Sequence, residues 1–344
     1  MTDPQDAWPT RPATDPVVAA VVVTYNRSTL LPRVLEGVRQ QSHPVQVVVV
    51  DNASTDGTAS LLEAAYPDVR VVRLPTNTGC TGGVRAGVQA AQAHGATWVW
   101  IMDDDVVPRP DCLAQLLAAA QASGRRVVVP RRRMAGAVYP NGTGVFDEGQ
   151  QRAWFVPPEA TAPDGWLPID LFTFEGPLVH RSVLAQVEMP EAGLFIGADD
   201  ALFSARVYRT LGPGAAALAL DAAVDRLLPL PEAERHPSRV KRLLTGRPDW
   251  VLVPDTEAWK AAYRYRNRHF VLRELGWTRQ HLRYALLHLG FAAVDAFYAA
   301  RRGGAWRLRL TAFLQAWLLG VLDVRTPFLD PASFHRALRR VHGG

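Results

Sequence analysis

Hydrophobic and polar positions follow two alternating periods over roughly the first 130 residues of the chain. Short valine-rich runs predict strands over 17–24, 45–50, 69–74, 97–102 and 127–129. Helices are expected between and after them, over 28–41, from 55 or 56 to 65, from a glycine-rich turn at 77–83 to 94, and over 111–122. Strands that alternate with helices through short loops predict an α/β fold with a mostly parallel, Rossmann-like sheet flanked by helices.

The regular alternation of predicted strands and helices ends at about residue 130. Gly, Pro and Arg predict loops or short hairpins over 131–168, followed by a strand at 170–174 and a helix at 200–211. From about residue 250 the chain is helical, basic and aromatic. These changes predict a flexible leader over 1–16, an α/β domain over 17–249 and a helical C-terminal extension over 250–344.

Composition narrows the class of protein. Of the 344 residues, 48% are hydrophobic, which supports a folded core. The two cysteines, Cys80 and Cys112, give no disulfide framework and fit a reducing compartment, so the cytoplasm is the expected location. The net charge is +5, but no nucleic-acid recognition motif accompanies the arginines. Anionic lipid head groups or a phosphorylated substrate fit them at least as well, and no nucleic-acid partner is expected.

The C-terminal helices leave two interpretations open. Residues 281–300 and 305–322 are apolar but carry charged residues, so no apolar run reaches the roughly 18 residues of a membrane-spanning helix. These helices either lie on a membrane or pack against the rest of the protein. The first interpretation gives the protein a peripheral position on the inner face of the cytoplasmic membrane.

Three consecutive carboxylates, Asp103, Asp104 and Asp105, follow the predicted strand at 97–102. Adjacent carboxylates repel one another, and a hard divalent cation is a common counter-charge for them. Because side chains alternate along a strand, Asp103 and Asp105 are expected to point one way and Asp104 the other. The alternative is an acidic turn that caps the next helix.

Polar clusters follow each of the first four predicted strands. They are Thr24-Tyr25-Asn26-Arg27, Asp51-Asn52, Asn77 to Gly83, and Asp103 to Asp105. The carboxyl ends of parallel strands meet at one edge of the sheet, and ligands bind there in such folds. The four clusters are therefore expected to form one binding site.

Together these motifs resemble the family 2 glycosyltransferases, which have the GT-A fold. The order and spacing match over roughly residues 17–211, and the glycines of the third cluster are Gly79, Gly82 and Gly83. Asp199-Asp200, followed by Phe203 and Arg206, and the run from Tyr263 to Arg268 resemble the galactofuranosyl- and rhamnosyl-transferase branch in particular.

The resemblance implies a nucleoside diphosphate sugar as donor, linked to UDP or dTDP, and a glycan or lipid-linked acceptor. Thr24, Tyr25 and Asn26 would line the nucleotide pocket, Asp51 would accept a hydrogen bond from the base, and Arg27 would meet the diphosphate or lie on the surface. Asn77, Gly82 and Gly83 would let the backbone approach the donor. Asp104 would face the nucleoside or brace its loop.

The resemblance also implies the chemistry. Asp103 and Asp105 would hold Mg²⁺ or Mn²⁺ across the two phosphates. These enzymes invert the anomeric centre, which requires a base on the acceptor hydroxyl. Asp200 is the expected base, with Asp199 as helix N-cap and as the second choice. Glu175 is assigned to the acceptor or to a structural loop, and Trp154 and Trp166 to stacking on sugar rings or to the core.

The sequence departs from the family pattern at one place. Many relatives carry a His about 25 residues after the base as a third metal ligand, whereas this chain reads Ala223-Val224-Asp225-Arg226. Asp225 or His236 is the candidate replacement. Two other functions stay open at this stage: a nucleotidyltransferase acting on sugar phosphates, and a protein that binds nucleotide sugars without catalysis.

Overall fold

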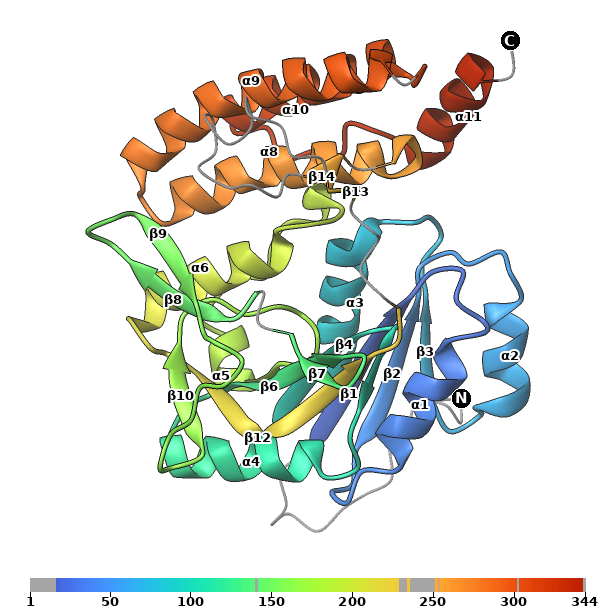
Figure 1. Cartoon of the computed structure of the whole chain (residues 1–344). Coiled ribbons are helices and arrows are strands. Elements are labelled where there is room, and N and C mark those ends of the chain that lie inside the picture. Colours follow the sequence, from blue (N-terminus) through green and yellow to red (C-terminus); the bar gives the residue numbers. More distant parts are fainter. Residues whose placement is uncertain are drawn as a thin grey trace. The chain divides into compact units, whose positions relative to one another are not determined.

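The fold of the first part of the chain is built on one mixed sheet (Figure 1). Its strand order is β10-β12-β6-β11-β4-β1-β2-β3. Strands β1, β2, β3 and β4 form the parallel part and comprise Val18–Thr24, Gln46–Asp51, Arg70–Arg73 and Trp98–Asp103. The parallel βαβ arrangement expected for this part of the chain is thus confirmed.

The rest of this sheet mixes directions. Strands β6 and β12 are parallel to each other, whereas β11 is antiparallel to both β4 and β6. Strands β5 and β7 pair at the margins, with β12 and β6 respectively. The bounds are β5 Val106–Pro108, β6 Val127–Met134, β7 Ala137–Val138, β10 Trp166–Ile169, β11 Leu178–His180 and β12 Ala216–Arg226. A separate hairpin joins β8 Gly144–Asp147 to β9 Arg152–Phe155.

This computed structural model describes residues 17–139, 142–228, 234–235, 251–252, 254–301 and 303–342. The expected leader and the expected boundary at 249–250 lie outside the described residues. The chain divides into two compact units. Unit 1 comprises residues up to Ala192 together with Phe203–Leu228, and unit 2 comprises Gly193–Leu202 together with the residues from Pro229 onward.

Helices cover both faces of the sheet in unit 1. They are α1 Leu31–Arg39, α2 Thr58–Ala65, α3 Gly79–Ala93, α4 Cys112–Ser123, α5 Arg181–Leu184 and the part of α6 Asp199–Leu211 that belongs to this unit. Successive residues of β1 alternate between two hydrophobic clusters: Val22 packs with Leu35 of α1, and Val21 packs with Val88 of α3. This two-sided burial is why β1 reads as an uninterrupted apolar run.

The structure differs from the sequence predictions at three places. The helix expected over 28–41 is shorter, because α1 begins at Leu31 with Leu30 at its N-cap. Residues 170–174 form no strand; only Leu171 makes an isolated bridge, to Gly144. The strand β12 was not predicted, because its alanine-rich sequence lacks the usual β-branched signal.

Unit 2 is helical in its described part beyond residue 254. It contains the short helix η3 Asp255–Glu257 and the helices α8 Ala258–Glu274, α9 Thr278–Arg301, α10 Trp306–Val321 and α11 Pro331–His342. Ala262 of α8, Ala292 of α9 and Phe313 of α10 meet in one hydrophobic cluster. The short pair β13 Glu234–Arg235 and β14 Val251–Leu252 also belongs to this unit. None of the described helices is both long and apolar enough to cross a membrane.

Candidate active site

Asn26 ties the loop after β1 to the loop after β2. Its backbone is left-handed, with φ of 54°, a conformation that Asn tolerates better than most residues. The Asn26 Oδ1 atom accepts a hydrogen bond from Thr55 N at 2.7 Å, and Asn26 N donates to Ser54 Oγ at 3.0 Å. Asn26 therefore shapes the candidate nucleotide pocket through its neighbours.

Asn52 joins the loop after β2 to the start of α3. Its side chain is buried and donates to Gly79 O at 2.8 Å, while its Oδ1 accepts from Thr78 N at 2.9 Å. Asn52 N itself donates to Thr24 O at 2.9 Å. Asn52 thus links the ends of β1 and β2 to the start of α3 through its backbone N and its side chain. Sequence reasoning quoted it in a motif but did not select it. Its position directly after Asp51, at a strand end, was the available signal.

Asp51 lies buried at the end of β2 and accepts a hydrogen bond from Ser54 N at 2.9 Å. This contact uses Oδ1 and leaves Oδ2 as a further acceptor on the same carboxylate. Asn77 holds the entry to α3, since its Oδ1 accepts from Gly79 N at 2.8 Å. The two residues lie on loops that Asn52 links.

Gly82 and Gly83 lie inside α3 instead of in a turn before it. A Cβ atom on Gly83 would lie 2.4 Å from Val23 Cγ1, and one on Gly82 would lie 2.3 Å from Thr78 Oγ1. Their lack of a side chain therefore lets α3 pack closely against β1 and its own N-terminus. This packing gives the two glycines a structural role, and the expected approach of the backbone to the donor stays a prediction.

The three consecutive aspartates have three different surroundings. Strand β4 ends at Asp103, and Asp104 and Asp105 form a turn, so strict strand alternation does not apply. Asp104 Oδ2 accepts from Tyr25 N at 3.2 Å, and its Oδ1 lies 3.8 Å from Arg27 Nε. Asp104 thus braces the loop after β1. The alternative of a helix-capping turn does not hold, because α4 begins at Cys112 with Asp111 at its N-cap.

The acidic turn gathers three carboxyl groups whose charged form is disfavoured by their surroundings. Burial raises the pKa of Asp103 well above its usual range, and repulsion from Asp105 and Glu175 adds to this. Burial also raises the pKa of Asp104 to about 6, against the hydrogen bond from Tyr25 N and the nearby Arg27 guanidinium. For Asp105 the rise in pKa through burial is opposed by Arg226. Clusters with such shifts are frequent at functional sites.

Arg226, at the end of β12, lies beside Asp105. Its Nη2 is 3.0 Å from Asp105 Oδ2, and its Nη1 forms an ion pair with Glu175 Oε1. The other Glu175 oxygen lies 3.2 Å from Arg132 Nη1. Both oxygens of the buried Glu175 carboxylate are therefore engaged by guanidinium groups, which supports its structural role. Sequence reasoning did not select Arg226 or Arg132.

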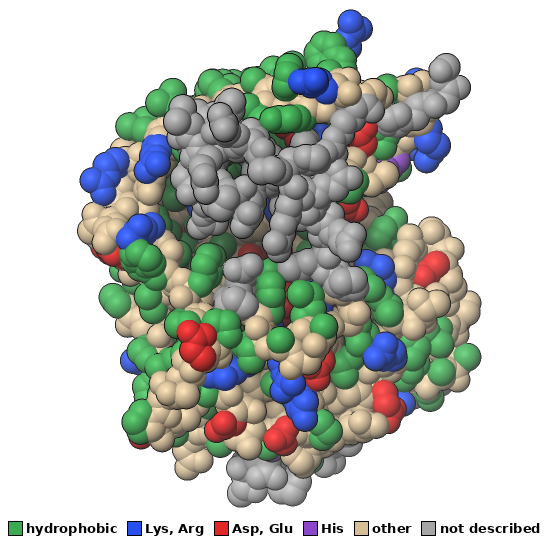
Figure 2. Space-filling view, viewed as in Figure 1, with side chains coloured by type: hydrophobic (Ala, Val, Ile, Leu, Met, Phe, Trp, Pro, Cys, Tyr) green, Lys and Arg blue, Asp and Glu red, His purple; other side chains and the backbone are tan. Residues whose placement is uncertain are grey.

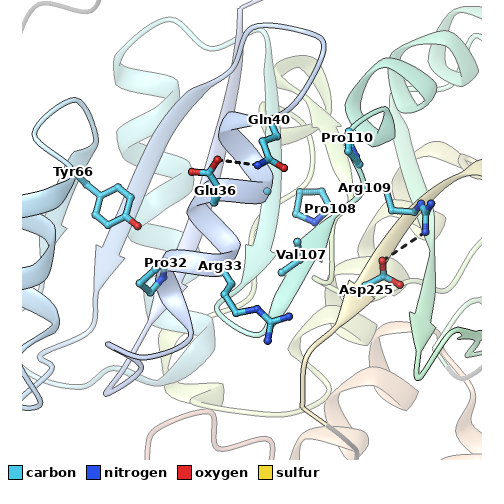
Figure 3. A pocket seen from close by; sticks show the side chains of 11 residues that line it. Pro32, Arg33, Glu36, Gln40, Tyr66, Val107, Pro108, Arg109, Pro110 and Asp225 are labelled. Carbon is cyan, nitrogen blue, oxygen red and sulfur yellow. Dashed lines mark hydrogen bonds and ion pairs between the residues drawn. The ribbon is translucent and has the colours of Figure 1, made fainter.

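Asp225 is not placed as a third ligand beside Asp105. Neighbouring side chains on a strand point to opposite faces, and Asp225 lies 3.9 Å from Arg109 Nη1 and 3.6 Å from Arg133 Nε. Figure 3 shows Asp225 and Arg109 in a pocket that α1 and the segment after β5 also line. The other candidate, His236, lies outside the described residues.

Asp199 and Asp200 open α6 within the residues of unit 2. The preceding segment has left-handed backbone at Phe195, Gly197 and Ala198, with φ of 64°, 81° and 62°. Such strain persists only where the surroundings hold it.

The buried Asn267 of α8 holds this segment. Its Nδ2 donates to Leu194 O at 2.9 Å and Gly197 O at 2.7 Å. The neighbouring Arg266 donates to Gly193 O at 2.8 Å. The arginine-rich helix thus fixes the backbone that leads into Asp199-Asp200.

Trp154 lies on β9 and is 47% exposed. Its indole Nε1 donates to Asp147 at 3.2 Å, and the Arg152 guanidinium lies 3.5 Å from its ring centroid. Trp166 belongs to β10 and packs against the hydrophobic cluster of unit 1, so its core role is the one the structure supports. No group of three or more His, Cys, Asp or Glu side chains arranged for a metal ion occurs among the described residues.

Comparison with known proteins agrees with the motifs. The family described as Glycosyl transferase family 2 matches residues 19–159. Galactofuranosyltransferase GlfT1 of Mycobacterium tuberculosis is 32% identical over 271 residues, which cover 75% of this chain and 83% of that protein. The N-acetylglucosaminyl-diphospho-decaprenol L-rhamnosyltransferase of the same species is 33% identical over 136 residues. That match covers 36% of this chain and 44% of the relative.

Solved structures share the fold at low sequence identity. Residues 1–349 of S. aureus TarS in complex with UDP give a TM-score of 0.52 at 15% identity, covering 95% of this chain and 91% of that one. The structure of GalNAc-T7 with UDP, GalNAc and Mn²⁺ gives a TM-score of 0.53 at 15% identity, covering 76% of this chain and 48% of that one. These likenesses support the GT-A architecture.

Proposed function

The chain belongs to glycosyltransferase family 2, and on this premise we propose that it transfers galactofuranose or rhamnose from a UDP- or dTDP-linked donor to a glycan or lipid-linked acceptor. Membership of this family excludes the alternative function of a nucleotidyltransferase acting on sugar phosphates. The names of the two Mycobacterium relatives, a galactofuranosyltransferase and a rhamnosyltransferase acting on a decaprenol-linked sugar, support the proposed sugars and acceptor class.

The observation that carries the proposal is the convergence of three loops beyond the carboxyl ends of β1, β2 and β4. Asn26, Asn52 and Asp104 bind these loops together through the hydrogen bonds described above. A rigid polar edge at this end of a parallel sheet is the usual place for a nucleotide. In the proposed complex Asp51 accepts from the base, the loop from Thr24 to Asn26 lines the pocket, and Arg27 meets the diphosphate.

The donor set of the acidic turn fits a divalent cation. Mg²⁺ and Mn²⁺ accept one or two protein carboxylates together with phosphate oxygens, and Asp103 and Asp105 offer such carboxylates with raised pKa values. When bound there, the ion would neutralise the charge that develops on the departing diphosphate. We propose that Asp103 and Asp105 hold it.

Inversion at the anomeric centre requires a single displacement. The acceptor oxygen forms a bond to the anomeric carbon while the bond to the diphosphate oxygen breaks, and the electron pair leaves with the nucleoside diphosphate. Asp200 takes the proton from the acceptor hydroxyl. Asp199, the residue before it, is the second choice for this role. Trp154, exposed on its hairpin, offers an aromatic face to an acceptor sugar.

The experiment that tests this function measures nucleoside diphosphate release by the purified full chain. A panel of UDP-, dTDP- and GDP-sugars is offered with lipid-linked and glycan acceptors, in Mn²⁺, Mg²⁺ or EDTA. We expect metal-dependent release from UDP-galactofuranose or dTDP-rhamnose and an inverted glycosidic linkage in the product. Release from neither donor with any acceptor, although UDP binds, would contradict the proposed reaction.

We also propose that unit 2 brings the enzyme to an anionic membrane surface. Leu282 and Leu286 of α9 are 63% and 74% exposed and lie one helical turn apart. The exposed Arg279 and Arg283 each precede one of these leucines by about one turn. In Figure 2 apolar and basic side chains share the visible surface of this unit. A helix face of this composition suits the boundary between head groups and acyl chains.

The membrane contact predicts a specific loss. Leu286→Asp should weaken co-sedimentation with vesicles containing phosphatidylglycerol by roughly tenfold, because an apolar side chain no longer enters the lipid. Leu211→Asp is the matched control, since Leu211 is an exposed leucine of unit 1. Equal binding of wild-type protein to anionic and neutral vesicles, or equal losses in the two variants, would contradict this contact.

A further inference from the structure

Arg226 supplies a fixed positive charge to the acidic turn. Strand β12 runs beside β5, with Arg226 opposite Val106, and Leu227 N donates to Asp105 O at 2.8 Å. This backbone pairing holds the Arg226 side chain next to Asp105, 121 positions earlier in the sequence. The contact is therefore built into the sheet.

The Arg226 guanidinium is shared by two carboxylates that are almost fully buried. The side chains of Asp105 and Glu175 are each 10% exposed, and that of Arg226 is 22% exposed. Glu175 is held in turn by Arg132, whose side chain is 6% exposed. This chain of charges orients Arg226 toward Asp105, and the guanidinium stays protonated at every physiological pH.

A divalent cation and the Arg226 guanidinium would both bind the Asp105 carboxylate. Mg²⁺ binds carboxylate oxygens at about 2.0–2.1 Å, while Arg226 Nη2 already lies 3.0 Å from Asp105 Oδ2. Two cations on one carboxylate repel each other at low local dielectric. Binding of the ion must therefore move the guanidinium away from Asp105 or proceed against its repulsion.

We propose that Arg226 is the resident counter-cation of the acidic turn and competes with a divalent cation for Asp105. It is a positioning residue that sets how tightly this site holds a metal ion. The proposal deepens the proposed function, on which it rests for the identity of the ion. Arg226 also lies in the segment where many relatives were expected to carry the histidine ligand.

The test is a titration of the full chain with Mn²⁺ alone, followed through the electron paramagnetic resonance signal of free Mn²⁺. Arg226→Gln keeps an amide donor for Glu175 and removes the charge. We expect it to bind Mn²⁺ at least about tenfold more tightly than the wild type, a coupling in the usual range for two interacting ligands. Arg226→Lys keeps the charge and should stay within about threefold of the wild type.

Two controls separate this effect from general electrostatics. Arg109→Gln removes an equal charge that pairs with Asp225 and should leave the affinity within about twofold, because Arg109 does not contact Asp105. Adding Asp105→Asn to Arg226→Gln should cancel the gain. If Arg226→Gln fails to fold, Arg226→His is expected to give the same or a larger gain at a pH where imidazole is neutral.

Three results would overturn the proposal. They are unchanged Mn²⁺ affinity in the folded Arg226→Gln or Arg226→His variant, an equal gain in Arg109→Gln, and a gain that survives Asp105→Asn. Failure of the proposed function has a different signature. In that case the Mn²⁺ titrations behave as expected, but the wild type neither binds UDP or dTDP nor releases a nucleoside diphosphate from any donor.

Discussion

Unit 1 and unit 2 both bury charged side chains, and the Arg309 network of unit 2 differs from the acidic turn of unit 1 in how its charges are compensated. Arg309 of α10 is 1% exposed. It donates to both oxygens of Asp295, at 2.7 and 2.6 Å, and to Asp255 at 2.9 Å. The second Asp255 oxygen accepts from Ala305 N at 2.9 Å. This network ties η3, α9 and α10 together.

The acidic turn of unit 1 has the opposite balance. Asp103, Asp104 and Asp105 all keep raised pKa values, although Arg27 and Arg226 lie beside them. The difference teaches how to separate structural from functional polar groups. A buried charge with every hydrogen bond satisfied holds the fold together, whereas a carboxylate cluster whose pKa values stay raised is suited to bind a cation.

The largest expected effect comes from breaking the satisfied network. Arg309→Met leaves Asp295 buried without its partner and should lower the free energy of unfolding by about 3–5 kcal/mol. Arg307→Met, an exposed position on the same helix, should change it by at most about 0.5 kcal/mol. Chemical denaturation monitored by circular dichroism measures both. Equal losses in the two variants would contradict the structural role of the network.

Asp200 tests the distinction between structural and functional charges, because it is a carboxylate of unit 2 with a proposed catalytic role. Asp200→Asn should lower turnover by roughly a hundredfold or more, because the amide cannot take the acceptor proton. Binding of UDP, measured by calorimetry, should persist. If the substitution abolished UDP binding and left turnover per bound donor unchanged, Asp200 would belong to the binding site instead.

A third prediction uses the histidines of unit 2. His269 Nδ1 lies 3.0 Å from His281 Nε2, and His269 Nε2 lies 3.1 Å from His288 Nδ1. Burial, with the neighbouring imidazoles, lowers the pKa of His269 to about 3, and burial lowers the pKa of His288 to about 4. Burial also lowers the pKa of His281. The native state thus binds fewer protons than the unfolded state, whose histidines titrate near pH 6.5.

The contribution of the neutral His269 and His288 to the free energy of unfolding is therefore complete above about pH 6.5. It is lost as the pH falls toward 4 and then 3. His288→Gln removes one titrating group. It should reduce the loss of unfolding free energy by about 1.4 kcal/mol per pH unit between about pH 6 and 5. Denaturant titrations at several pH values measure this slope. An unchanged slope would show that His288 is protonated equally in both states.

The sequence predicted the parallel core because its strands are buried on both faces and rich in valine. It failed for β12, where alanines carry no strand signal, and for residues 170–174, where apolar side chains pack without a ladder. Phe172, for example, is fully buried in a cluster. Propensity cannot distinguish such a buried loop from a strand.

Sequence patterns could select the candidate site residues that end or directly follow a strand, as Asp51 and Asp104 do. Contacts between distant segments were not, since the pairing of Arg226 with Asp105 depends on the register of β12 beside β5. Gly82 and Gly83 show a second limit, because a glycine motif does not reveal whether a ligand or a strand approaches it.

The central claim is that the edge of the sheet beyond β1, β2 and β4 binds a nucleoside diphosphate. Calorimetric titration of UDP and of dTDP into the wild type and into Asp51→Asn tests it most directly. Asn keeps an acceptor for Ser54 N but loses the charged acceptor for the base, so binding should weaken by about tenfold or more. Asp221→Asn, at an exposed position of β12, should bind as the wild type does. Absence of binding of both UDP and dTDP to the wild type, or equal affinity in Asp51→Asn, would contradict the account.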